Sequence, residues 1–401
     1  MPRPPRALGS LGSPGTRRVV SAVLAVTATA VFLVTVPLHR HWFDVAVYHG
    51  AVNSWVHDGG ALYAYLRPGT VYGFTYPPFA ALCMLPMAWV DWPTTVVLAA
   101  TLNIVAGLLV LQWTAGPLIR RQGWPYWYAM VLAGCLLSLL EPVRDTFTFG
   151  QVNLALLALV LLDAELLRRG SRWAGYATGL AAAVKLTPAL FIGWLLLAGH
   201  RRAGLTAAVT AAAATLFAAL TAPGASRTFW TRALWDTDRV GSLSYAGNQS
   251  LRGTLARLDA PEWVWAVAVV AVLAVWAYKV RRADVTHGVA LTGVAACLVS
   301  PVTWVHHLVW MIPALAVLAG EALRVRTRAR VAVAAGAYVI LCSSIVWLWL
   351  DDPGRGGVGS LVGGSAYVWI AMGLLLAPRH GWRSRARTGP ILADRVGERA
   401  G

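Results

Sequence analysis

Residues 19–49 read VVSAVLAVTATAVFLVTVPLHRHWFDVAVYH, a largely apolar run followed closely by a carboxylate. The part from Val19 to Leu38 is long enough to cross a bilayer as a helix, so we expect a retained first membrane helix. Asp44 follows where the chain would leave the membrane. A charged acid at a membrane boundary is costly to hold, which makes Asp44 a candidate functional residue.

The composition extends this pattern to most of the chain. Hydrophobic residues make up 58% of the sequence and charged residues 13%, with a mean hydropathy of +0.60. A soluble domain carries about twice that share of charge. Because backbone polar groups in lipid must be satisfied internally, helices are the expected form. We therefore predict an all-α polytopic membrane protein with about twelve transmembrane helices and a re-entrant or interfacial segment.

The basic residues indicate a topology. The net charge is +17, an excess that could also suit nucleic acid. The arginines lie in short turns between apolar runs, however, which is the positive-inside pattern. We therefore place both termini in the cytoplasm and predict a multi-pass protein of a bacterial plasma membrane. The turns assigned to the cytoplasm are 17–18, 120–121, 168–172, 200–202, 279–282, 324–330 and the tail from 379.

The opposite side then receives most of the polar, non-basic segments, which are 39–76, 141–153, 185–188, 223–261, 300–307 and 351–360. The resulting division has a disordered basic N-terminus at 1–18, a transmembrane catalytic domain at 19–377 and a basic cytoplasmic tail at 378–401. The first extracytoplasmic segment of that domain is 39–76. Charge bias and the placement of polar motifs agree on this topology.

Two stretches do not fit simple crossings. The run 173–199 is too long for one span with both basic ends inside, so we expect two short helices broken near 185–188. Pro188 suits such a break because proline removes a helix donor and disfavours helix in the residue before it. The run 77–90 is too short to span, so it is the predicted re-entrant or interfacial segment.

Neither a metal nor a cofactor is indicated. The four cysteines each lie inside an apolar run and read as small buried hydrophobes. His306 and His307 are adjacent, and neighbouring residues point in different directions on a helix, so they form a poor chelating pair. One histidine could instead serve a phosphate or leaving group while the other is a structural donor.

Several polar residues each have a functional and a structural interpretation. Asp44 could act as a general base toward a hydroxyl, or it could cap a helix that starts near Val45. Gln151 and Asn153 open an apolar run, where they could bond neighbouring helices or substrate hydroxyls. Lys185 follows a small-residue run and needs an anionic partner such as a lipid phosphate, unless it extends to the interface.

Other candidates come from the outer segments. Arg252 is a second candidate for a phosphate because its planar fork matches phosphate oxygens. Asn248 stands in the same outer segment. The aromatic residues of 39–76 suit the membrane interface but could also stack on a sugar or line a lipid groove.

Taken together, these motifs resemble glycosyltransferase family 87 of the GT-C superfamily. The matching segments, in the expected order, are 44–48, 74–78, 150–153, 185–188, 248–253 and 300–307. The resemblance covers roughly residues 20–375. It implies a GT-C fold and a mannosyltransferase that takes mannose from polyprenyl-phosphate-mannose on the extracytoplasmic face. The acceptor it implies is a glycolipid or glycan, joined with inversion through an α-1,2 or α-1,6 linkage.

The resemblance also assigns roles. It implies that Asp44 is the catalytic base. Many GT-C enzymes carry a pair of acids here, but Val45 and Ala46 follow Asp44, so a metal-binding acid pair is absent. For the donor phosphate we nominate Lys185, Arg252, His306 and His307. For the remaining substrate contacts we nominate Tyr48, Tyr76, Gln151, Asn153 and Asn248.

Alternatives remain open from the sequence. The nearest is an arabinofuranosyl transferase of the same superfamily. A transporter for lipid-linked glycans would show paired discontinuous helices in two related halves, whereas the sequence indicates one break and no repeat. The acceptor could be a phosphatidylinositol mannoside, a lipoarabinomannan-type polymer or a protein.

Overall fold

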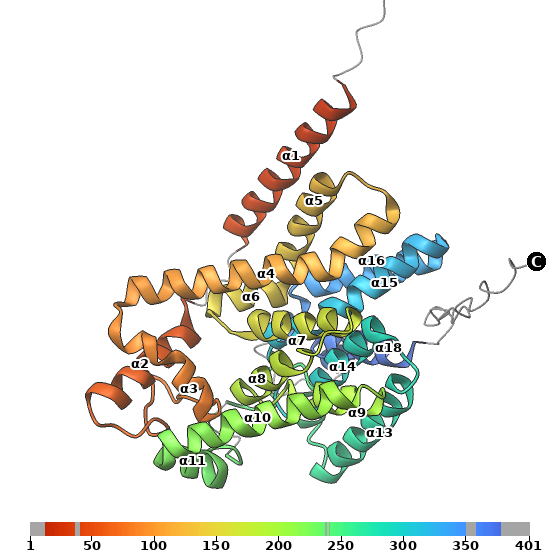
Figure 1. The fold of residues 1–401 in the computed structure, drawn as a ribbon. Coiled ribbons are helices and arrows are strands. Elements are labelled where there is room, and N and C mark those ends of the chain that lie inside the picture. The colour runs from red at the N-terminus through yellow and green to blue at the C-terminus, as the bar shows by residue number, and fades with distance from the viewer. Residues whose placement is uncertain (1–12, 37–40, 237–238, 240, 350–357, 378–401) are drawn as a thin grey trace, which may run out of the picture.

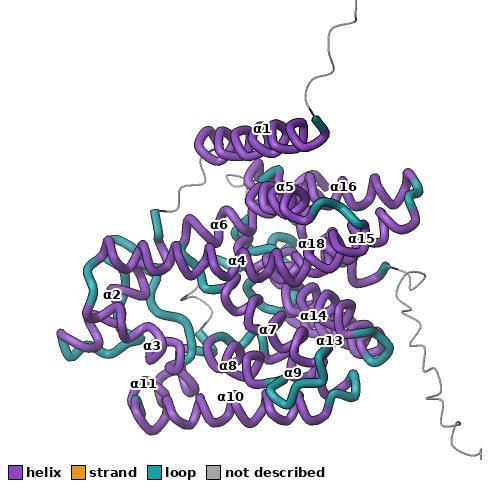
Figure 2. Tube along the Cα trace, turned by 45° about the horizontal axis from the view of Figure 1, so that its top comes forward, coloured by secondary structure: helices purple, strands orange, loops and turns teal. Residues whose placement is uncertain are grey.

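The computed structural model describes residues 13–36, 41–236, 239, 241–349 and 358–377. This part of the chain is helical and contains no strand beyond isolated bridges at Leu66–Gly73 and Asn248–Trp304 (Figure 2). The predicted all-α class is therefore confirmed. The predicted tail 378–401 and residues 1–12 of the predicted N-terminus lie outside the described residues.

The first half of the chain forms α1 (Pro14–Thr35), α2 (Phe43–His57), α3 (Pro78–Met84), η1 (Leu85–Trp89), α4 (Trp92–Gln122), α5 (Tyr126–Leu139), α6 (Glu141–Phe149), α7 (Asn153–Arg168), α8 (Tyr176–Val184) and α9 (Ala189–Leu197). The second half forms α10 (Arg201–Thr221), α11 (Pro223–Thr228), η2 (Phe229–Ala233), α12 (Leu251–Ala256), α13 (Glu262–Val280), α14 (Val285–Val299), η4 (Val305–Met311), α15 (Ile312–Val325), α16 (Arg328–Cys342), η5 (Ile345–Trp349), α17 (Val358–Gly363) and α18 (Ala366–Leu376).

Five helices among the described residues are long and apolar enough to cross a membrane. They are α1, α4, α10, α13 and the continuous run Val305–Val325 formed by η4 and α15. The pair α5 and α6, bent by 72°, would make a sixth as a broken span or a re-entrant loop. The structure thus supports a polytopic membrane protein, while the predicted count of twelve crossings is not confirmed.

Local signals explain where the helices begin and end. Ser13 caps α1 by accepting a hydrogen bond from the Thr16 backbone N–H at 3.2 Å. Residues 14–18 are therefore helical, which corrects the prediction that the first 18 residues are disordered. The break at 185–188 is observed as predicted, between α8 and α9. The predicted re-entrant or interfacial run forms the short apolar helix Pro78–Trp89.

The core gathers around α14 and α7. Residues 288–298 of α14 are buried, and the helix packs against α13, α15, α18 and η4. Figure 1 shows α1 extending from the body of the molecule, with α2, α3 and α11 grouped at the opposite end. A second apolar cluster lies at that end and includes Tyr48, Phe74 and Tyr76. Val152 and Val184, which are next to the predicted polar residues Gln151 and Lys185, pack against both cores.

Candidate active site

Asp44 lies in the first turn of α2. The helix begins at Phe43 with Trp42 as its N-cap, so Asp44 lies inside the helix and does not cap it. An acid in the first turn is favoured by the helix dipole. The Trp42 N–H donates to the Thr148 carbonyl at 2.9 Å, which ties the start of α2 to the end of α6.

A directed chain of hydrogen bonds starts at this carboxylate. Gln151 Nε2 donates to Asp44 Oδ2 at 2.6 Å, and Tyr76 OH donates to Gln151 Oε1 at 2.7 Å. Tyr48 OH in turn donates to Tyr76 OH at 2.9 Å. Asn153 Nδ2 reaches the same Gln151 oxygen at 3.3 Å. With its oxygen occupied by two donors, the Gln151 amide must present its N–H to Asp44.

Lys185 lies at the break between α8 and α9 and forms the other end of this series of hydrogen bonds. Its backbone is extended there, and the residue is 8% exposed. Its Nζ lies 2.9 Å from Asn153 Oδ1, 3.0 Å from His307 Nε2 and 3.4 Å from Tyr76 OH. Burial lowers the pKa of Lys185 to about 7, while the charge of Asp44 acts to raise it. In its ammonium form Lys185 carries only donors, and it then sets the direction of the bonds that lead to Asp44. We call Asp44, Tyr48, Tyr76, Gln151, Asn153, Lys185 and His307 the Asp44 cluster.

The environment of Asp44 shifts its acidity. α2 is not among the candidate membrane spans. Burial raises the pKa of Asp44 to about 6, while the Gln151 hydrogen bond and the charges of Lys185 and Arg67 act to lower it. A carboxyl group with a pKa near neutrality can exchange a proton at the pH at which cells work, as a general base must.

His306 and His307 are used differently. Only the His307 ring contacts Lys185. The His306 ring packs against Phe149 and His307, with centroids 5.0 and 4.7 Å away. The His306 carbonyl accepts from Thr146 Oγ1 at 3.3 Å and from Asn153 Nδ2 at 3.5 Å. This geometry agrees with the expectation that the side chains of His306 and His307 point in different directions.

The segment around Asn248 supports η4 and reaches the Asp44 cluster through it, because Asn248 forms a bridge with Trp304, whose N–H donates to His307 Nδ1 at 3.2 Å. Asn248 Oδ1 accepts from the Thr303 N–H at 2.9 Å, and its Nδ2 donates to the Pro301 carbonyl at 3.3 Å. Arg252 donates to Glu262, and its Cζ lies 4.9 Å from the Trp265 ring centroid. The structure therefore does not bring Asn248 and Arg252 into the cluster. The sequence placed both residues in one outer segment, on the same side as the other candidates, but Glu262 engages the Arg252 guanidinium.

Sequence reasoning missed Arg67. Its Cζ lies 4.3 Å from the Phe43 ring, and its Nη1 donates to the Phe43 carbonyl at 3.4 Å. From there its charge lowers the pKa of Asp44. One signal was available, because Arg67 is a basic residue inside the segment 39–76 that was otherwise assigned to the side poor in arginine.

Among the described residues, no group of three or more His, Cys, Asp or Glu side chains is placed to hold a metal ion. The four cysteines lie there as free thiols. The chemistry that the Asp44 cluster offers is therefore that of one carboxylate, one lysine, one imidazole and several neutral hydrogen-bonding groups.

An all-helical chain with several candidate membrane spans thus holds a carboxylate and a lysine in one buried polar cluster, and costly buried charges of this kind mark functional sites. The model of glycosyltransferase family 87 matches residues 74–301, more than half of the chain. The protein therefore belongs to glycosyltransferase family 87, as the sequence motifs predicted.

Similar proteins agree with this assignment. The chain is 34% identical over 378 residues to a polyprenol-phosphate-mannose-dependent α-(1-2)-phosphatidylinositol mannoside mannosyltransferase of Mycolicibacterium smegmatis, covering 86% of this chain and 85% of the relative. A protein of the same description from Mycobacterium tuberculosis is 33% identical, with 69% of each chain covered. A pentamannoside mannosyltransferase of M. smegmatis is 33% identical over 73% of this chain and 72% of its own. Family and relatives indicate a mannosyltransferase. No solved structure matches the chain.

Gly150 gives a test of how the cluster is positioned. Its φ is +70°, and an added Cβ would lie 2.2 Å from Val45 Cγ2. We expect Gly150→Ala to lower the melting temperature of the purified protein by more than left-handed backbone strain alone, which costs roughly 1–3 kcal/mol, because the added Cβ also overlaps Val45. The matched control is Gly59→Ala, which has a φ of +66° but nothing within 4 Å. Equal melting temperatures for the two variants would contradict the close approach of α2 to the α6–α7 turn.

Proposed function

We propose that the protein transfers mannose from polyprenyl-phosphate-mannose to a phosphatidylinositol mannoside type of glycolipid, with inversion and formation of an α-1,2 linkage. The relatives' names specify this donor, acceptor and linkage. The observation that carries the proposal is the directed chain from Lys185 through Tyr76 and Gln151 to Asp44, because it gives one cluster both a base and a cation.

In this mechanism Asp44 is the general base. Gln151 occupies Oδ2, so the acceptor hydroxyl would approach Oδ1. As the hydroxyl oxygen bonds to the anomeric carbon of mannose, its proton passes to Asp44. The bond between that carbon and the phosphate oxygen breaks on the opposite side, and the electron pair leaves with polyprenyl phosphate. No co-reactant is required for this balance.

The leaving phosphate gains charge, and the cationic end of the cluster suits it. Lys185 Nζ can donate to phosphate oxygens, and His307 Nε2 lies 3.0 Å from it and orients it. Preorganised donors of this kind stabilise charge as it develops in the transition state. Tyr48, Tyr76 and Asn153 line the path between the two ends and are proposed to contact the sugar hydroxyls. Arg252 and Asn248 have no role in this proposal.

The proposed side of action is extracytoplasmic. The Asp44 cluster is built from segments 39–76, 141–153, 185–188 and 300–307, and the basic turns of the chain lie elsewhere in the sequence. By the positive-inside rule this supports an active site on the outer face of a plasma membrane, with both termini in the cytoplasm. The relatives' names favour mannose over arabinofuranose and a transferase over a transporter.

Asp44→Asn tests the base. The substitution preserves shape and removes the proton acceptor, so we expect turnover to fall by about 10²–10⁴-fold, the range typical of a general base. The assay is mannose transfer in membranes supplied with labelled polyprenyl-phosphate-mannose. Turnover close to that of the unaltered protein would reject the assignment.

The pH profile tests the same group independently. A base must be deprotonated, so activity should decline as the pH falls below about 6, the raised pKa of Asp44. Gln151 lowers that pKa through its hydrogen bond, and Gln151→Leu should therefore move the acid limb to higher pH. An acid limb that stays in place or moves to lower pH in Gln151→Leu would contradict this role.

The two lysines of the chain provide a matched pair for the donor phosphate. Lys185→Met should weaken binding of polyprenyl phosphate by about tenfold or more, because a hydrogen bond to a charged group contributes roughly 1.5–3 kcal/mol. Lys279 donates to the carbonyls of Leu375 and Ala377 and serves as the control. Binding is measured for folded protein by titration with the lipid. Similar losses in Lys185→Met and Lys279→Met would argue against a phosphate at Lys185.

A further inference from the structure

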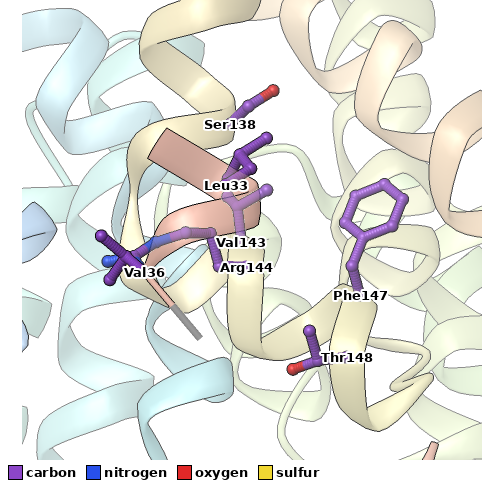
Figure 3. A pocket seen from close by; sticks show the side chains of 7 residues that line it. All are labelled: Leu33, Val36, Ser138, Val143, Arg144, Phe147 and Thr148. Carbon is purple, nitrogen blue, oxygen red and sulfur yellow. The ribbon is translucent and has the colours of Figure 1, made fainter. Parts of the chain in front are cut away.

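A cavity separate from the Asp44 cluster lies where the end of α1 meets α5 and α6. Its volume is about 300 Å³, and Figure 3 shows the side chains that line it. They are Leu33, Val36, Ser138, Val143, Arg144, Phe147 and Thr148. The walls are mainly apolar, with one guanidinium group and two hydroxyl groups.

Arg144 is the unusual member of this lining. It is 5% exposed, and one of its nitrogens, Nη2, donates to the Cys342 carbonyl at 2.8 Å and to Ser344 Oγ at 3.4 Å. Its Nε and Nη1 are buried and have no hydrogen-bond partner among the described residues. A buried charged donor without a partner is costly, so these two nitrogens indicate an anionic ligand. Figure 3 shows the Arg144 side chain reaching toward Val36.

The neighbouring acid Glu141 offsets part of the Arg144 charge but makes no hydrogen bond to its Nε or Nη1. Its two carboxylate oxygens accept hydrogen bonds from Trp347 Nε1 and from Tyr367 OH, on η5 and α18. These partners draw the carboxylate toward the C-terminal part of the fold. Arg144 reaches both sides: its Nη2 donates to Cys342 and Ser344, while its Cζ lies 5.1 Å from the ring centroid of Phe32 on α1, at the edge of the cavity. An arginine fork in this position matches the oxygens of a phosphate.

The surroundings select a ligand with an apolar tail. Leu33 and Val36 at the cavity edge are 38% and 37% exposed, and Val31 and Val34 along α1 are 55% and 78% exposed. α1 is a candidate membrane span with only 6% of its apolar window buried, so its side faces lipid. Acyl chains could therefore continue from the cavity along α1 and α5 without leaving an apolar environment.

Opposite sides of α6 face the cavity and the Asp44 cluster. Val143, Arg144, Phe147 and Thr148 face the cavity, whereas the Thr146 side chain contacts the His306 carbonyl. We propose that this cavity is a lipid-phosphate site, in which Arg144 Nε and Nη1 bind the phosphate of a membrane lipid whose chains lie along α1. It is distinct from the phosphate position proposed at Lys185, and it does not depend on which sugar is transferred.

The test is native mass spectrometry of the full-length protein in detergent, titrated separately with phosphatidylglycerol, phosphatidylinositol, polyprenyl phosphate and phosphatidylcholine. Phosphatidylcholine is the zwitterionic control. The polyprenyl phosphate titration uses the Lys185→Met background, in which binding at the first site is weakened. We expect an anionic lipid to bind well above phosphatidylcholine, and Arg144→Gln to reduce that binding about tenfold or more. Arg172→Gln, at an exposed arginine beside Trp173, should leave binding unchanged.

A second variant keeps the test decisive if Arg144→Gln fails to fold. Leu33→Trp fills the mouth of the cavity from a half-exposed position of α1 and leaves every charge in place, so it should reduce lipid binding as well. Binding that depends on Arg144 supports the site. If only the glycerophospholipids or only polyprenyl phosphate bind in this way, the result also identifies which class of lipid supplies the phosphate. Equal binding of phosphatidylcholine, or full binding in both Arg144→Gln and Leu33→Trp, would overturn the proposal.

Discussion

A lysine ammonium held among buried side chains is the constraint on which the site depends. Lys185 is placed there by the break between α8 and α9, and it carries only hydrogen-bond donors. Lys185 donates to Tyr76 and Asn153. Both of these donate to the Gln151 oxygen, so the Gln151 N–H points at Asp44. A cation and a carboxylate are thus connected through neutral groups whose directions are fixed. Such polar networks are stable in a low-dielectric interior only when their members are satisfied.

The backbone conformation around this network positions its side chains. Gly150 takes a positive φ and lets α2 approach the α6–α7 turn, so that Gln151 reaches Asp44. Pro188 ends the extended segment that presents Lys185 and begins the turn into α9. The segment around Asn248 supports η4 from the other side through Thr303. Residues far apart in the sequence therefore act on one small region, which is the arrangement a catalytic site requires.

Much of this arrangement could be predicted from the sequence, for identifiable reasons. Apolar runs gave the helical class, and Pro188 gave the break at Lys185, because both signals are local. Membership of family 87 followed from ordered motifs. The contacts of Arg252 with Glu262 and Trp265 could not be predicted, since they depend on how α12 meets α13. The number of spans was also beyond reach, because buried helices such as α14 are as apolar as true membrane spans but too short to cross.

The most direct test of the account is an experimental structure of the protein with a non-transferable analogue of polyprenyl-phosphate-mannose. The account predicts the phosphate within hydrogen-bonding distance of Lys185 Nζ, with the anomeric carbon facing Asp44. A phosphate bound at Arg252 would contradict it. An anomeric carbon that faces away from Asp44, with Tyr48 and Tyr76 between the carbon and the carboxylate, would contradict it as well.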